Sequence, residues 1–504
     1  MKEKNEMDKK KLNEEDILKY LQTVMDNKFA HYIMKEMAET KKIEKSLAIY
    51  AGVEKPSGVR ESLRAKTVSV AIERAAKMFN AEPEDIKSFL KDPYMRKGFS
   101  VIIRGIAEYG ISKPQRLSAP FMVVWNFTKQ CNLKCKHCYA NAKPYPAPDE
   151  LTLEQKMEVL RQLDEAGVAA ISFSGGEPLI NRDFWLVAKK ASELGFYVSV
   201  ATNGTLITEE VAKRLKEIGV RYVEISIDGP TAEIHDEFRG VKGAFDRSIN
   251  AIKILKKLGG IDVGIATVAT HHNLDTMPDM IKLGRELNVD RMIFFNFIPT
   301  GRGKDIAKGD LRPEEREKLM KYLYSEWHKG DMQIFSTCPA YARISLTAVA
   351  EEKGHKLSPT HFADIELPEE YMNAGRTLAE FIGGCGAGRI YCSIEHNGDV
   401  QPCVFMPIKV GNVITDGFQQ VWDTSDIFLK LRDRDAEEYA CSTCPFRYVC
   451  GGCRARAYSY FGDVQGPDPG CIIQKDKWDE VTEKEDEDIH NAHMGESGKN
   501  HASS

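Results

Sequence analysis

Apolar residues at helical spacing mark the first part of the chain. They recur three and four positions apart, for example at Leu21 and Val24 and again at Val68 and Ile72, among many Lys, Glu and Ala residues. This period is typical of amphipathic helices. A polar stretch with two prolines, SKPQRLSAP, ends the pattern. We therefore expect an all-helical N-terminal extension over residues 1–115.

Short strands alternate with amphipathic helices from Phe121 onward. Six β-branched and aromatic runs indicate strands: MVVWNF, VAAISF, FYVSVA, YVEISI, DVGIATV and RMIFFNF. Helical stretches separate them, near 152–166, 182–194, 208–218, 244–258 and 275–287. This alternation predicts βαβ units, and so an α/β fold whose parallel sheet, over residues 116–310, curls into a barrel or a doubly wound layer. In either architecture reactive groups belong on the loops that follow the strands.

The strand and helix repeat stops after about residue 310. A loop and one further helix open a poorly patterned bridge over residues 311–384. Residues 385–480 hold eight of the twelve Cys and much Gly, which predicts a small domain stabilised by bound metal more than by a core. Residues 481–504 are polar, and we expect them to be disordered.

Composition and charge narrow the class of protein. The 504 residues are 42% apolar, enough for about three folding units with a sizeable core. Seventy Lys and Arg against 75 Asp and Glu leave a net charge of -5, so we expect no nucleic-acid partner. No run of apolar residues is long enough to span a membrane, and the charged start MKEKNEMDKKKLNEED lacks an apolar segment. We expect a soluble, cytoplasmic protein.

Three cysteines lie together directly after the first predicted strand. Cys131, Cys135 and Cys138 form a C-x3-C-x2-C motif. In the reducing cytoplasm cysteines favour metal or redox chemistry over disulfides. Three thiolates in one loop can hold three corners of a [4Fe-4S] cube and leave one iron open to a ligand from outside the protein. The alternative is a zinc site completed by His137 or by a distant residue.

This loop resembles the defining motif of the radical SAM superfamily, and the resemblance covers roughly residues 120 to 300. It implies a partial (β/α)6 barrel, similar to a TIM barrel, in which the open iron binds S-adenosylmethionine (SAM). It also implies that one electron from the cluster cleaves SAM to a 5'-deoxyadenosyl radical, which abstracts hydrogen from an unactivated C–H bond of the substrate. Such an enzyme needs an external low-potential electron donor of the flavodoxin or ferredoxin type.

A second segment after the second predicted strand points the same way. Gly175 and Gly176 allow the backbone to approach a ligand, and Glu177 can accept hydrogen bonds from an ammonium group. With Pro178 they resemble the family's GGEP segment, which binds the SAM amino group. Alone, the segment could be an ordinary tight turn.

Three more polar residues near predicted strand ends or in the following loops resemble family positions. Ser226 and Arg239 are expected at the SAM ribose and carboxylate, and Asn203 close to the same pocket. The alternative for each is a structural polar group with its hydrogen bonds satisfied inside the protein.

The C-terminal part holds enough cysteines for two closed [4Fe-4S] cubes, which take four thiolates each. They are Cys385, Cys392, Cys403, Cys441, Cys444, Cys450, Cys453 and Cys471. Their order resembles the SPASM domain, which carries two auxiliary clusters, although Cys450 and Cys453 are one residue closer than is often seen. The resemblance therefore implies three [4Fe-4S] clusters in all, one that binds SAM and two auxiliary. A pair of zinc ribbons is the alternative.

The family's order of cysteines also implies a partition. One auxiliary cluster would take Cys385, Cys392, Cys403 and Cys453, and the other would take Cys441, Cys444, Cys450 and Cys471. If Cys392 is only a buried thiol, the first cluster has an open iron that could bind the substrate. Cys338 is unassigned, and we favour a core cysteine over a substrate-side thiol or a radical partner.

Auxiliary clusters suit a net oxidation, because a nearby redox centre can accept an electron from the substrate radical. The segments CNLKCKHCYANA and CPFRYVCGGCRARAYSYFGD resemble the branch that modifies the side chains of haem and haem d1. A tetrapyrrole side chain or an isoprenoid lipid is therefore the expected small-molecule substrate. The alternatives are a maturase of a peptide or protein, and an iron-sulfur electron carrier without a substrate, for which the GGEP segment would be unnecessary.

One apolar stretch of the N-terminal extension bears on the lipid alternative. It includes Phe99, Val101, Ile102 and Ile106, and basic residues flank it. Such a helix could lie in a membrane interface and make a peripheral contact. We favour the other interpretation, an ordinary helix that faces the core.

Overall fold

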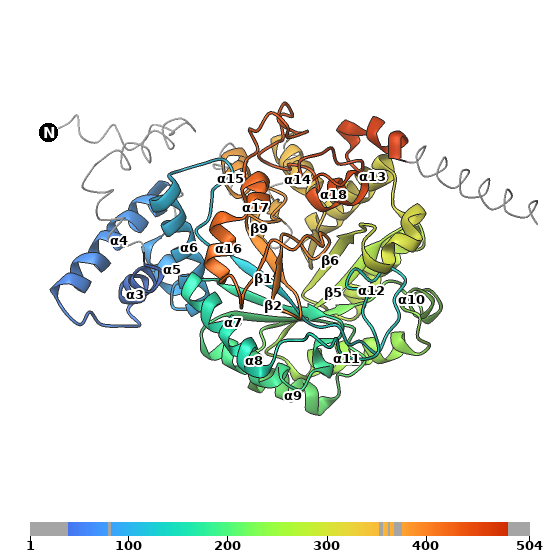
Figure 1. Cartoon of the computed structure of the whole chain (residues 1–504), viewed down its shortest axis with the longest axis horizontal. Helices are drawn as coiled ribbons and strands as arrows, with labels where there is room; N and C mark the ends of the chain where they lie inside the picture. The colour runs from blue at the N-terminus through green and yellow to red at the C-terminus, as the bar shows by residue number, and fades with distance from the viewer. Residues whose placement is uncertain (1–38, 79–81, 352–355, 361–362, 367–374, 482–504) are drawn as a thin grey trace, which may run out of the picture.

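The computed structural model describes residues 39–78, 82–351, 356–360, 363–366 and 375–481 (Figure 1). The apolar positions at Leu21 and Val24 and the polar end of the chain, 482–504, lie outside these residues, so the expectations for them stay predictions.

A ten-stranded sheet forms the centre of the molecule, in the order β12-β11-β10-β1-β2-β3-β4-β5-β6-β7. Its first six strands are those expected from the sequence: β1 (Met122–Thr128), β2 (Ala170–Gly175), β3 (Tyr197–Thr202), β4 (Tyr222–Ser226), β5 (Asp262–Ala269) and β6 (Arg291–Asn296). All six are parallel. The α/β class and the mostly parallel sheet are thereby confirmed.

Helices cover the outer face of this sheet (Figure 1). They are α7 (Leu153–Ala166), α8 (Phe184–Glu193), α9 (Glu209–Glu217), α10 (Ala232–Arg239), α11 (Ala244–Leu258) and α12 (Met277–Glu286). Local signals set their ends: Thr152 and Gln155 form a capping box at the start of α7, and Gly167 ends it in the left-handed conformation. The short α10 is the one helix of this series that the apolar pattern did not predict.

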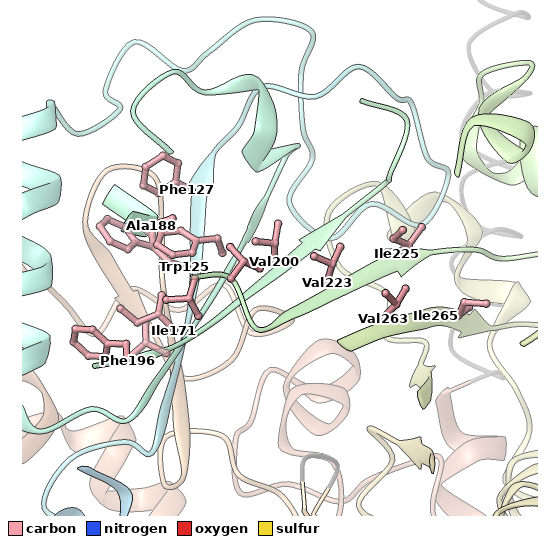
Figure 2. Packing of buried hydrophobic residues seen from close by; sticks show 14 of the residues in the cluster. Trp125, Phe127, Ile171, Ala188, Phe196, Val200, Val223, Ile225, Val263 and Ile265 are labelled. Carbon is pink, nitrogen blue, oxygen red and sulfur yellow. The ribbon is translucent and has the colours of Figure 1, made fainter. Parts of the chain in front are cut away.

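Alternation along each strand separates a packed outer face from an open inner face. Trp125 and Phe127 are fully buried against the helices, whereas Val124 of the same strand lines an internal cavity. Trp125 stacks on Phe173 at 5.8 Å between ring centroids, and Phe184 from α8 completes this aromatic group. Figure 2 shows the outward side chains following one another across neighbouring strands.

The bridge that follows β6 extends the barrel sheet. It contains α13 (Pro313–His328), β7 (Gln333–Ser336), α14 (Ala340–Ala350), a hairpin of β8 (Lys356–Thr360) and β9 (Ala363–Glu366), and α15 (Gly375–Ile382). Strand β7 pairs in parallel with β6 and adds a seventh parallel strand that the sequence analysis did not foresee. Four residues, QIFS, are too few to show a strand period.

The N-terminal region is helical where the structure describes it. Its helices are α3 (Thr40–Tyr50), α4 (Val59–Met78), α5 (Pro83–Phe89) and α6 (Pro93–Tyr109), and they lie at one flank of the barrel (Figure 1). Helix α6 joins two cores: Val101 belongs to the main one, and Phe99 and Ile103 pack with α3 and α4. Since neighbours cover its apolar sides, the expectation of membrane contact through this helix finds no support.

No helix among the described residues combines the length and apolar character that a bilayer crossing requires.

The cysteine-rich segment is built onto the barrel sheet. Its strand β10 (Tyr391–Ile394) pairs in parallel with β1, and β11 (Asp399–Gln401) and β12 (Gly411–Asn412) follow in antiparallel fashion. Helices α16 (Phe418–Thr424), α17 (Asp426–Arg432) and α18 (Arg454–Phe461) complete it. Trp422 and Phe428 are fully buried in the main core. This segment therefore shares the barrel's hydrophobic core, and its stabilisation by bound metal stays a prediction.

Candidate active site

The loop after β1 brings three thiols together at the carboxyl end of the sheet. Cys131, Cys135 and Cys138, which we call the loop thiols, pack around the same small apolar group. Backbone hydrogen bonds anchor the loop at both ends and in the middle: Cys131 N donates to Lys143 O at 2.7 Å, and Lys134 N donates to Arg239 O at 3.1 Å. The tertiary structure thus holds this loop against the end of α10.

Hydrogen-bond donors point at the sulfur atoms of two loop thiols. Burial raises the pKa of the Cys131 thiol to about 12 and also raises the pKa of Cys135. The amide of Leu133 points at the Cys131 sulfur at 3.4 Å, and Arg239 Nη1 lies 3.7 Å from the Cys135 sulfur. A bound cation would stabilise the thiolates.

Metal-ligand spacing bears on the zinc alternative. Across the part of the chain that the structure describes, no three His, Cys, Asp or Glu side chains converge closely enough to hold a single metal ion. A multi-iron cube is larger than one ion, so its ligands stand farther apart. The assignment of a cluster to the loop thiols rests on the C-x3-C-x2-C motif and on its position directly after β1.

The SGGEP turn packs directly on the first residues of the thiol loop. Gly176 N donates to Thr128 O and Glu177 N to Gln130 O, both at 2.7 Å. A Cβ atom at Gly176 would lie 2.1 Å from the Gln130 carbonyl oxygen, and Gly175 has φ +115°. Both glycines are therefore required by the close approach of two backbones.

Glu177 lies buried between two loops of the site. Its carboxylate is fully buried and accepts hydrogen bonds from Thr202 Oγ1 and Asn203 N at 2.8 Å and from Leu179 N at 3.2 Å. Burial raises the pKa of Glu177 to about 7, against the opposing effect of these donors. The side chain joins β2 to the loop after β3, and its contact with a SAM ammonium stays a prediction.

A buried group of charges lies beside the loop thiols. Asp228, after β4, faces Arg239 Nε at 2.6 Å and His137 Nε2 at 3.5 Å. Burial would raise the pKa of Asp228, but the Arg239 guanidinium outweighs it and holds that pKa below its usual value. Burial also lowers the pKa of His137 to about 3, so its ring is neutral. Arg239 is thus oriented by Asp228 with its guanidinium at the cavity wall.

One cavity of about 490 Å³ extends from the thiol loop to the C-terminal domain. On the loop side its wall includes Tyr139, Ser174, Ser226 and Arg239. The Tyr139 hydroxyl lies 3.0 Å from both Asn126 Oδ1 and Ser174 Oγ. Asn203 does not line this cavity; its amide donates to Asn132 Oδ1 at 2.8 Å within the loop. Its expected place near SAM stays a prediction.

Small side chains keep the inside of the barrel open. Ser172 of β2, Ser199 of β3 and Ala266 of β5 face it, so the interior holds a cavity where a closed barrel is normally filled. Glu224 also faces this space, next to the Tyr222 hydroxyl at 3.3 Å. Burial raises the pKa of Glu224 to about 7. Glu224 was not among the residues predicted from the sequence, although it precedes Ser226 by two residues and so shares its face of the strand.

Three C-terminal cysteines close the other end of the cavity. Cys385, Cys403 and Cys453, which we call the cavity thiols, pack in one apolar group and line the cavity wall. Tyr391 donates a hydrogen bond from its hydroxyl to the Cys403 sulfur at 2.7 Å. A redox centre held by the cavity thiols would face the same space as His137 and Tyr139 of the thiol loop.

Four further cysteines form a separate group, which we call the outer thiols. They are Cys441, Cys444, Cys450 and Cys471, and electrostatic interactions connect them. The amide of Gly452 points at the Cys450 sulfur at 3.4 Å, and the amide of Phe446 at that of Cys444 at 3.5 Å. None of the outer thiols is among the residues that line the cavity.

Two cysteines lie apart from both of these groups. Cys392 is fully buried in the main core, on β10, and is not part of the cavity wall. Cys338 also belongs to the main core, but it reaches the cavity wall as well. The expected role of Cys392 as a ligand beside the cavity thiols is a prediction that its position does not favour.

Comparisons with known proteins agree with this geometry. The model of the radical SAM superfamily matches residues 125–284, and that of the SPASM iron-sulfur cluster-binding domain matches residues 385–445. An AdoMet-dependent heme synthase from Oleidesulfovibrio alaskensis is 35% identical over 357 residues, which are 71% of this chain and 88% of that protein. A pre-heme d1 synthase from Dinoroseobacter shibae is 32% identical and covers 70% and 86% of the two chains.

A solved structure shows the same fold at lower identity. SuiB from Streptococcus suis, bound to the precursor peptide SuiA, has a TM-score of 0.57 and 20% identity, with 85% of this chain and 92% of that chain covered.

Proposed function

The chain belongs to the radical SAM superfamily, carries a SPASM domain and is related to heme synthases, and from this premise we propose that it oxidises a side chain of a haem precursor. The observation that carries the proposal is one cavity. Residues next to the loop thiols line one end of it, and the cavity thiols line the other end. A substrate in this space would contact the cavity thiols at one end and residues beside the loop thiols, such as Tyr139 and Arg239, at the other.

The loop thiols would hold the SAM-binding cluster, and the cavity thiols and outer thiols would hold the two auxiliary clusters. When bound, the first cluster and SAM supply a 5'-deoxyadenosyl radical, which takes a hydrogen atom from the substrate. Net oxidation then requires the substrate to give up one further electron, with loss of carbon dioxide if a carboxylate side chain is decarboxylated. The cavity thiols would keep an electron acceptor within reach.

The chain's own residues shape the site for this chemistry. Ser226 and Arg239 lie on the cavity wall where SAM is expected, and Asp228 fixes the Arg239 guanidinium. Apolar side chains such as Phe295 and Phe405 line the space between the two ends and exclude water from it. An external low-potential donor of the flavodoxin or ferredoxin type would supply the first electron.

Two observations favour a tetrapyrrole over the alternatives. Relatives that share about a third of their residues with this chain are named as heme and pre-heme d1 synthases. Helix α6, the candidate contact for a lipid, is covered by neighbouring helices and by the barrel. A peptide is the second candidate, because SuiB was solved with a precursor peptide. A winged helix needs strands, and none occurs in residues 39–78 or 82–121 of the described chain.

The test is anaerobic reconstitution with iron and sulfide, followed by dithionite and SAM. We expect 5'-deoxyadenosine from the unaltered chain and none from Cys135→Ala. In parallel reactions, a haem-precursor porphyrin, an isoprenoid lipid and a peptide are each supplied with deuterated side chains. Deuterium should enter 5'-deoxyadenosine from the porphyrin alone. Transfer from the peptide or the lipid would refute the substrate assignment, and a fully loaded protein that never cleaves SAM would refute the enzyme itself.

A further inference from the structure

We propose that three thiolates, those of Cys385, Cys403 and Cys453, hold the first auxiliary cluster, and that Tyr391 tunes this cluster through a hydrogen bond to the Cys403 sulfur. In this assignment Cys392 is a core residue and not a ligand. The inference rests on the SPASM domain of the chain and not on the identity of the substrate.

Strand parity separates Tyr391 from Cys392. The two residues are neighbours on β10, and successive side chains of a strand point to opposite faces. The Tyr391 hydroxyl reaches the Cys403 sulfur at 2.7 Å, so its face is the one toward the cavity thiols. Cys392 must then point the other way, and it is indeed fully buried in the main core.

The register of β10 prevents an exchange of the two faces. Cys392 pairs with Val123 of β1 on one side, and Ser393 pairs with Gln401 of β11 on the other. Turning Cys392 toward the cavity would require a shift by one residue, which would also move every other side chain of the strand to the opposite face. Ile394 would leave the main core, where it is fully buried.

The position of Tyr391 has a direct consequence for the cluster. Reduction adds negative charge to an iron-sulfur cluster, and hydrogen bonds to its sulfurs stabilise that charge and raise the reduction potential. Tyr391 and the cavity thiols all line the cavity, so a cluster held by these thiols would lie at the cavity wall. Tyr391 is therefore a positioning residue that acts through Cys403.

The test compares four variants by iron and sulfide content, electron paramagnetic resonance and reduction potential, all without substrate. Cys392→Ala and Cys392→Val should keep the full iron content and the spectrum of the unaltered protein. Cys403→Ala should lose one cluster, about four irons. Tyr391→Phe should keep all its iron, lower the potential of one auxiliary cluster and change the spectrum of that cluster alone.

The control for Tyr391→Phe is Tyr324→Phe. Tyr324 donates its hydroxyl to the Lys356 carbonyl at 3.0 Å and not to a sulfur, so the potentials should not change. Loss of one cluster in both folded Cys392 variants would show that Cys392 is a ligand and overturn the assignment. Unchanged potentials in Tyr391→Phe would overturn the role of the phenol. Because SAM cleavage and substrate turnover are not used, a wrong substrate proposal would leave these readouts unaffected.

Discussion

At Gly176 the backbone of the SGGEP turn passes too close to the thiol loop for any side chain to fit. We expect Gly176→Ala to push the turn away from Gln130, because its Cβ would lie 2.1 Å from a backbone oxygen. The variant should fold but lose most of its SAM-cleaving activity, measured as 5'-deoxyadenosine formed with dithionite.

Gly309→Ala is the matched control for this change, since a Cβ there meets nothing within 4 Å. It should retain the rate of the unaltered protein. A fully active Gly176→Ala would show that the contact between the turn and the loop is not needed.

Glu224 makes stability depend on pH. Its pKa is raised to about 7 by burial, against the opposing effects of Tyr222 and Arg291, whereas an unfolded Glu titrates near ~4.3. Between these values the folded state keeps a proton that the unfolded state has lost, so this contribution to stability falls as pH rises. The unfolding free energy of Glu224→Gln should therefore rise relative to that of the parent by about 1–3 kcal/mol as the pH goes from 4 to 8.

The measurement is the difference in apparent unfolding free energy between variant and parent at several pH values under anaerobic conditions. Ser199→Ala, which changes a non-titrating residue of the same cavity, should show a difference that does not vary with pH. A pH-independent difference for Glu224→Gln would contradict the raised pKa.

At the scale of elements, α6 connects the N-terminal helices to the barrel through close contacts. A Cβ at Gly105 would lie 2.4 Å from the Arg116 carbonyl oxygen. Alanine is the better helix former by about 1 kcal/mol, but the clash is with backbone that cannot move away easily. We expect Gly105→Ala to reduce the unfolding free energy by about 1–3 kcal/mol net and to lower the melting temperature.

Gly58→Ala, where a Cβ meets nothing within 4 Å, should leave the melting temperature of the N-terminal region unchanged. If Gly105→Ala were as stable as the parent or more so, α6 would be free to move on the barrel, and the joint between the two cores would be weaker than the structure indicates.

At the scale of the whole molecule, a buried ion network joins the barrel to the C-terminal domain. Asp310, before α13, lies 2.8 Å from Arg316 Nη2 and 3.3 Å from Arg456 Nε of α18, and all three side chains are buried. Asp310→Asn would remove the carboxylate that pairs with the buried guanidinium groups of Arg316 and Arg456. We therefore expect a loss of about 3–5 kcal/mol in unfolding free energy.

Glu209→Gln provides the comparison for this network. Glu209 pairs with Lys257 at 3.5 Å on the surface. The loss of unfolding free energy in Glu209→Gln should be at most about 1 kcal/mol. Equal effects of the two substitutions would mean that the Asp310 network does not connect the domains energetically.

Several features of the site could be predicted from single stretches of sequence. The spacing of Cys131, Cys135 and Cys138 after a strand, and the GGEP turn after the next one, depend only on local order along the chain. Parallel strands end at one edge, so the sequence also placed these two segments together. The α/β class followed from the strand and helix periods for the same local reason.

Other features depend on contacts between distant residues. Strand β7 was too short to predict, and the pairing of β10 with β1 joins residues far apart in the sequence. The hydrogen bonds that Thr202 and Asn203 donate to Glu177 join residues 25 and 26 positions apart, and no local pattern predicts them. Cys392 looked like any other cysteine of the domain until the register of β10 placed it in the core.

By itself, then, the sequence determined the chemistry that is available: which loops carry thiols, how those thiols are spaced, and which strands they follow. The tertiary structure alone decided which thiols share a cavity and which charges are buried. The physical reason is that local spacing is set by covalent connectivity, whereas burial and side-chain direction arise from packing between segments that meet only in the folded state.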